Sequence, residues 1–164
     1  MLTDAQMTTL AAAIRASTDP TVVAALSIRN DVALTDWCNS DSTFVVWKTK
    51  ATQDELMSLS GFEWAQIDNL TTGQAGIWEW LFSNNEKAIN PSKSQIRAGI
   101  SECWKGTAAK VAVATAVLDG CKRFASMVES MFATGTGTNA IPGALIVTGP
   151  VSLTEVSTAL NRNP

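Results

Sequence analysis

The side chains best suited to covalent or metal chemistry in this chain are three cysteines, Cys38, Cys103 and Cys121. Their spacings are wide, no Cys-x-x-Cys pair occurs, and the 164-residue sequence has no histidine to complete a zinc site or a Cys–His pair. Without histidine, the usual general base near neutral pH, a Ser–His–Asp hydrolase is also excluded. We therefore interpret the three thiols as small buried hydrophobic groups, and predict no catalytic residue, no cofactor and no metal site.

Two other motifs resemble ligand-binding or catalytic signals but lack the context that the chemistry needs. Residues 134–137, Thr-Gly-Thr-Gly, follow a predicted helix, whereas a phosphate-binding loop follows a strand and carries Gly-Lys-Ser or Gly-Lys-Thr. Glu79 lies between Trp78 and Trp80, and no spacing places a second carboxylate opposite it, as glycosidic chemistry requires. The first motif therefore predicts a turn, and the second a packing cluster.

Six tryptophans and no tyrosine make up an unusual aromatic content. Large rigid rings stabilise protein cores and partner interfaces. Side chains two residues apart on a helix point about 200° apart, so one of Trp78 and Trp80 should face the core and the other an edge or a neighbour. Stacking on nucleic acid normally needs a basic groove, and this chain has a net charge of −3. Core packing, inter-subunit packing and ligand stacking stay open, and we expect Trp47 and Trp80 to be interface residues.

The chain contains few charged residues. Charged residues make up 16% of the chain, against about 25% in a typical protein, so either a partner covers part of the surface or serine and threonine fill it. The acidic pI of about 4.9 argues against a dominant phosphate-binding face. No apolar run approaches the length of a membrane span and no signal peptide is evident, so we expect synthesis in a cytoplasm and no membrane contact.

The pattern of apolar residues and helix-start signals predicts a mainly α-helical fold. Capping boxes begin at Thr3, Thr52 and Ser152, where Gln or Glu follows the hydroxyl residue by three positions. Helices are predicted at about 3–16, 31–38, 53–59, 90–104, 107–133 and 152–160, with others starting near 20 and 72 and one ending near 70. Short β-branched or aromatic runs near 44–48 and 144–148 are strand candidates for a small β element.

The longest periodic segment, residues 107–133, predicts the long central helix of a helical bundle. Apolar residues recur in it at alternating spacings of four and three: Ala114, Leu118, Cys121, Ala125, Val128 and Phe132. A Gly/Thr-rich stretch then interrupts the pattern. We therefore predict a helical bundle domain at 1–139, and a C-terminal extended arm with a short terminal helix at 140–164.

Several stretches, taken together, resemble a family of small virion proteins of tailed bacteriophages. The similarity covers roughly residues 44–140 and is carried by 67–70 (Ile-Asp-Asn-Leu), Gly73, 77–82 (Ile-Trp-Glu-Trp-Leu-Phe), 89–92 (Ile-Asn-Pro-Ser), 96–99 (Ile-Arg-Ala-Gly) and 118–137. The resemblance implies a non-enzymatic head–tail connector, or adaptor, that forms a homo-oligomeric, twelvefold ring in the virion. It also implies contacts with the portal protein and with tail or neck proteins, and DNA passing through the lumen without sequence-specific binding.

A ring subunit must contact its neighbours over part of its surface, and the addition of a strand to a neighbour's sheet edge is one way to form such a contact. We therefore predict partner contacts from the apolar residues of the C-terminal arm, in addition to Trp47 and Trp80. These residues are Leu145, Ile146, Val147 and Val151. The alternatives are another phage component, such as a head-completion or tail-terminator protein, and a non-viral cytosolic module that binds a ligand among its tryptophans.

Overall fold

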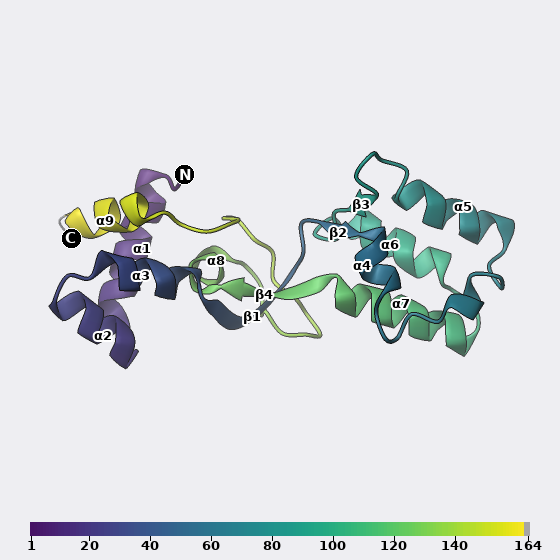
Figure 1. Ribbon diagram of the computed structural model, residues 1–164, viewed down its shortest axis with the longest axis horizontal. Helices are drawn as coiled ribbons and strands as arrows, with labels where there is room; N and C mark the ends of the chain where they lie inside the picture. Colours follow the sequence, from purple (N-terminus) through teal and green to yellow (C-terminus); the bar gives the residue numbers. More distant parts are fainter. Residues whose placement is uncertain (163–164) are drawn as a thin grey trace. The chain divides into compact units, whose positions relative to one another are not determined.

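The computed structural model describes residues 1–162 and is mainly α-helical with small β elements, as predicted (Figure 1). It divides into two compact units. Unit 1 contains Met1–Val45 and the described residues from Phe124 onward, and unit 2 contains Val46–Arg123. The chain passes from one unit to the other within β1 (Asp41–Trp47) and within β4 (Lys122–Ser126), and these strands pair with each other.

Unit 1 is a cluster of short helices around an aliphatic core. Its helices are α1 (Asp4–Ala16), α2 (Pro20–Ser27), α3 (Asp31–Asn39), α8 (Met127–Phe132) and α9 (Leu153–Asn161). Helix α9 packs against α1 and α3, and α8 packs against α3. The fully buried side chains include Leu10, Ile14, Val22, Leu34, Val128 and Val156. Sequence-distant segments therefore build this core together.

Unit 2 has an aromatic core. Its elements are β2 (Ala51–Thr52), α4 (Gln53–Met57), the 3-10 turn η1 (Trp64–Gln66), α5 (Thr72–Leu81), β3 (Ala88–Ile89), α6 (Ser94–Cys103) and α7 (Ala108–Gly120). Helices α5 and α7 both pack against α6, and β2 pairs antiparallel with β3. The Trp78 and Trp104 rings meet edge to face at 5.4 Å, and Phe62 meets Trp104 at 5.5 Å. Such aromatic pairs add to the stability that burial provides.

The predicted long helix over 107–133 is wrong. Helix α7 ends at Gly120, β4 follows, and a new capping box at Ser126 starts α8. A β-carbon at position 120 would lie 2.4 Å from Leu59 Cδ1, so glycine lets the Leu59 side chain pack closely against the end of the helix. The regular spacing of apolar residues suggested one helix, but these residues belong to two different cores. Cys121 is buried in the core of unit 2, and Val128 is buried in the core of unit 1.

The predicted division into a bundle at 1–139 and an arm at 140–164 is also wrong. Val156 and Leu160 lie in the core of unit 1, so α9 is part of that unit. The first strand candidate is confirmed as β1, whereas the second, 144–148, is strand-like only at Ala144, which forms a β-bridge with Thr134. The last two residues of the predicted arm, 163–164, lie outside the described residues.

The Gly/Thr-rich stretch closes over one aromatic ring. Val45 N–H donates to the Gly137 carbonyl at 2.7 Å, and Gly143 N–H donates to the Val45 carbonyl at 2.8 Å. A β-carbon on Gly137 would lie 2.2 Å from the Phe44 ring, and one on Gly143 would lie 2.3 Å from it and 2.8 Å from the Thr134 carbonyl oxygen. Both glycines are therefore needed so that the loop can cover Phe44.

We expect Gly143→Ala to lower the free energy of unfolding by about 1–3 kcal/mol, because the added methyl group overpacks a rigid site. Urea unfolding followed by circular dichroism measures this. Gly76→Ala is the matched control, since position 76 has open space and lies in α5, where alanine is the better helix former. Equal stability of the Gly143→Ala variant and the wild type would contradict the packing described here.

Candidate interaction surfaces

The three cysteines are free and buried, as expected from the sequence. Burial raises the pKa of Cys38 and Cys121 to about 12 and that of Cys103 to about 11. The Cys103 thiol also donates to the Gln74 carbonyl oxygen at 3.3 Å. Within residues 1–162, no group of three or more His, Cys, Asp or Glu side chains is placed to hold a metal ion. The thiols therefore act as core side chains.

Lys110 and Gln74 are polar side chains buried in unit 2. The Lys110 ammonium donates to the Gln74 side-chain oxygen at 3.0 Å. The Gln74 amide nitrogen in turn donates to the Lys105 carbonyl oxygen at 2.9 Å. This chain of hydrogen bonds ties the start of α5 to the residues that precede α7. We interpret it as structural.

The tryptophans fall into three environments. Trp78 and Trp104 are buried in the core of unit 2, and Trp37 packs partly against that of unit 1. Trp80 is 70% exposed, so the expectation that Trp78 and Trp80 face opposite ways is confirmed. Trp64 is 60% exposed, although it is not among the predicted interface residues. Its surroundings gave no clear helical or strand period, because they form only the 3-10 turn η1.

Trp47, a predicted interface residue, is half-buried and packs against the core of its own unit. The Arg97 guanidinium carbon lies 4.6 Å from the Trp47 ring centroid, and the Lys122 ammonium lies 5.5 Å from it. Cations at these distances are attracted by the negative face of the ring. Trp47 therefore already has cationic partners within unit 2, and it offers less free surface than Trp80.

Residues 145–148 (Leu-Ile-Val-Thr) form the most unusual segment of unit 1. Their main-chain N–H and C=O groups make no hydrogen bond with any part of the chain that the structure describes. Immediately before them, Ala144 and Thr134 exchange two hydrogen bonds of 2.9 Å. The segment therefore follows a residue that is held by two hydrogen bonds, but its own backbone is not paired within the described chain. Its residue types nevertheless favour a strand.

The chain is fixed again just after this segment. Gly149 N–H donates to the buried Glu129 carboxylate at 3.0 Å. The Asn39 side chain then pairs with both main-chain groups of Val151, accepting from its N–H at 2.8 Å and donating to its carbonyl oxygen at 2.9 Å. Val151, a predicted partner-contact residue, is only 4% exposed, so its side chain offers almost no free surface to a partner. The Asn39 contacts hold it against the body of unit 1.

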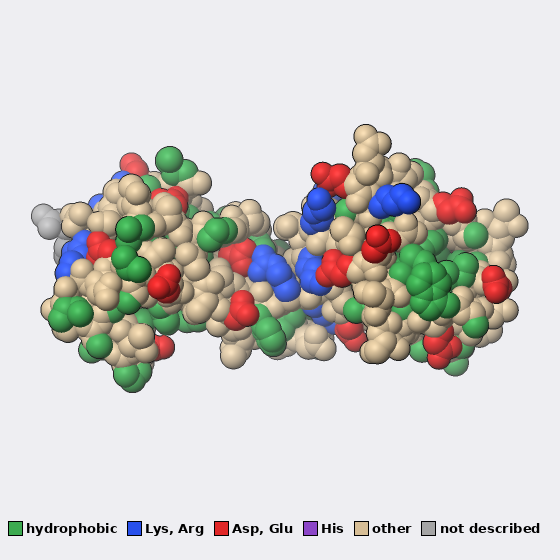
Figure 2. All heavy atoms as spheres, viewed as in Figure 1, with side chains coloured by type: hydrophobic (Ala, Val, Ile, Leu, Met, Phe, Trp, Pro, Cys, Tyr) green, Lys and Arg blue, Asp and Glu red, His purple; other side chains and the backbone are tan. Residues whose placement is uncertain are grey.

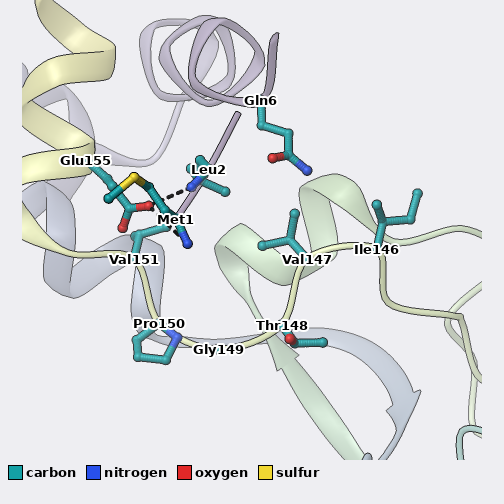
Figure 3. Close-up of a pocket in the computed structure, with 10 residues that line it drawn as sticks. All are labelled: Met1, Leu2, Gln6, Ile146, Val147, Thr148, Gly149, Pro150, Val151 and Glu155. Atoms are coloured by element: carbon teal, nitrogen blue, oxygen red, sulfur yellow. Dashed lines mark hydrogen bonds and ion pairs between the residues drawn. The ribbon is translucent and has the colours of Figure 1, made fainter. Parts of the chain in front are cut away.

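The side chains of the segment alternate as they would in a half-covered strand. Leu145 and Val147 are half-buried, whereas Ile146 is 65% exposed and Thr148 is exposed. Residues 146–151 line a hollow of about 220 Å³ together with Leu2 and Glu155, and Figure 3 shows Val147 directed toward Leu2. Val147 packs against the core, so Ile146 is the apolar group that stays available to a partner.

The predicted interface residues are divided between the two units. Trp47 and Trp80 belong to unit 2, and the four residues of the C-terminal segment belong to unit 1.

Comparison with known proteins found no matching family model, curated protein or solved structure. In the described part of the chain, no helix has the length and apolar character needed to cross a membrane.

We expect all three thiols to be inert in the folded chain. At about pH 8, a thiol with its pKa raised to the values given above is thiolate in far fewer than 1% of molecules, whereas an unfolded thiol has a pKa of about 8.5. Reaction with a chromogenic aromatic disulfide should be at least about 100-fold slower in the native protein than in guanidinium. A thiol that reacts natively at the unfolded rate would contradict its burial.

Proposed function

We propose that this chain is a non-catalytic structural subunit of a tailed-bacteriophage virion, an adaptor at the head–tail interface. In this role it joins copies of itself into a ring on the portal and also contacts tail or neck proteins. The assembly role has two lines of support. The first is the resemblance over residues 44–140, and the second is the unpaired segment 145–148. The segment is the structural observation on which the proposal depends.

A strand from a neighbouring protein can complete this segment. It would supply the hydrogen bonds that the backbone of 145–148 lacks, while Ile146 would lose its exposure. The fixed points at Ala144 and Gly149 limit the conformations of the segment, so less entropy is lost on binding than for a free tail. In a ring, each subunit would offer this segment to the next through a head-to-tail contact.

The acidic character of the chain suits a conduit for DNA. With a net charge of −3 on each chain, the ring would not hold the phosphate backbone through counterion release. DNA would then pass through the lumen without sequence-specific binding. This support is compositional, and it bears on the role of the lumen rather than on assembly.

Point substitution tests the proposal better than truncation does. Removing residues 140–164 would also remove Val156 and Leu160 from the core of unit 1, so loss of function would then report unfolding. Ile146 is exposed and has no packing role in the core, so changing it should leave unit 1 folded. Ile28, which is 74% exposed in the same unit, provides a matched control.

We expect Ile146→Lys to reduce incorporation of the chain into phage particles by at least about tenfold, because a charge placed at a buried contact is costly. Quantitative mass spectrometry of purified particles, with the variant supplied in place of the wild type, measures this. Ile28→Lys should be incorporated normally, and circular dichroism should show both variants folded. Normal incorporation of Ile146→Lys would contradict the role of the segment.

The position in the virion has its own test. Cryo-electron microscopy of intact particles should place the wild-type chain in a ring against the portal. Density at the tail terminus or at a head-completion level would replace the adaptor role with one of those roles. Absence of the wild-type chain from purified particles would overturn the proposal as a whole.

A further inference from the structure

A second surface, in unit 2, has the features of a built binding site. Beside the exposed Trp64 indole lies a hollow of about 590 Å³, lined by Gln53, Asp54, Met57, Ser58, Leu59 and Trp64. Figure 2 shows a compact hydrophobic patch on this unit with acidic side chains near it. The hollow combines one large aromatic face, two apolar side chains and one carboxylate. It contains none of the residues predicted from the sequence as interface residues.

The turn that carries Leu59 packs closely against helix α7. Leu59 sits against Gly120, where a β-carbon would lie 2.4 Å from it, and Gly61 sits against Ala116, where a β-carbon would lie 2.7 Å from the Ala116 β-carbon. Phe62 N–H donates to the Leu59 carbonyl oxygen at 2.9 Å and closes the turn between them. These contacts restrict the conformations of the turn, which lowers the conformational entropy lost when a ligand enters.

The Trp64 ring packs against the buried Phe62 ring. The Phe62 ring is buried and meets the Trp64 ring edge to face, with 5.6 Å between centroids. Ile67 N–H donates to the Trp64 carbonyl oxygen at 3.0 Å, so the backbone at Trp64 is also fixed. An indole that is positioned this firmly and still 60% exposed presents a preformed stacking surface.

The charge around this indole is uncompensated. The carboxylates of Asp54, which lines the hollow, and Glu63, which precedes Trp64, have no hydrogen-bond or ion-pair partner among the described residues. Nearby Glu55, by contrast, is paired with Lys48 at 2.5 Å. No Lys or Arg side chain lines the hollow in the described part of the chain. A cationic group would complement this site.

We propose that the hollow binds one arginine side chain of a partner protein. The guanidinium plane would stack on the Trp64 indole and donate to the Asp54 carboxylate, and Met57 and Leu59 would contact the aliphatic part of the side chain. Arginine fits better than lysine because its planar group can stack and donate hydrogen bonds at once. The same chain already places one arginine over an indole, with the Arg97 guanidinium carbon 4.6 Å from the Trp47 ring centroid.

This inference does not depend on the proposed virion role, because it concerns binding by the isolated full chain. The probe is the blocked tripeptide acetyl-Gly-Arg-Gly-amide, and its counterpart with citrulline has the same shape without the charge. Indole N–H signals of the uniformly 15N-labelled protein are followed by NMR during titration. The Trp64 signal is identified by its disappearance in Trp64→Phe.

The chain also provides a matched control. Trp80 is an exposed indole next to the exposed carboxylate of Glu79, and neither residue lines the hollow. We expect the arginine peptide to shift the Trp64 signal saturably and to leave the Trp80 signal nearly unchanged. Asp54→Asn should weaken binding by about three- to fivefold, as for loss of one exposed charge contact, and Glu79→Gln should have no effect.

Three results would overturn the inference. The first is an equal shift of the Trp64 and Trp80 signals, which would indicate unspecific stacking on any exposed indole. The second is equally tight binding of the citrulline peptide, which would remove the charge from the explanation. The third is the absence of a saturable shift with the arginine peptide. If methyl glucoside shifts the Trp64 signal instead, the hollow binds a neutral sugar.

Discussion

The contact between Leu59 and Gly120 is the constraint on which much of this structure depends. Because Gly120 has no side chain, the Leu59 side chain can lie directly on the end of helix α7. The helix stops there, and the chain continues as β4 and then re-enters a helix at the Ser126 capping box. One packing contact thus accompanies the change from unit 2 to unit 1, and it also fixes the floor of the hollow beside Trp64.

Local signals in the sequence predicted local structure well. The capping boxes at Thr3, Thr52 and Ser152 all start helices, because they satisfy backbone N–H groups within a few residues. The predicted helix starting at Asn90 begins later, at Ser94, and the helix expected to end near residue 70 is only a 3-10 turn. The long helix failed because apolar spacing does not reveal whether its residues share one core.

The surfaces were less accessible to prediction than the helices. Exposure of Trp80 followed from helix geometry, whereas exposure of Trp64 depends on Phe62 being anchored under it in the core. Val151 was expected to contact a partner, yet the Asn39 side chain, far away in sequence, holds it inside unit 1. The strand expected at 144–148 does not form, because a strand needs a partner and the described chain provides one only at Ala144.

The burial of all three native thiols has a practical consequence for studying this molecule. A cysteine placed at an exposed position would be the one accessible sulfhydryl among the described residues of the folded chain, so spectroscopic labels could be attached without first removing the native cysteines. Replacing Cys38, Cys103 or Cys121 would leave cavities in closely packed cores. Distances between labelled copies could then report the geometry of an assembly in an otherwise unaltered protein.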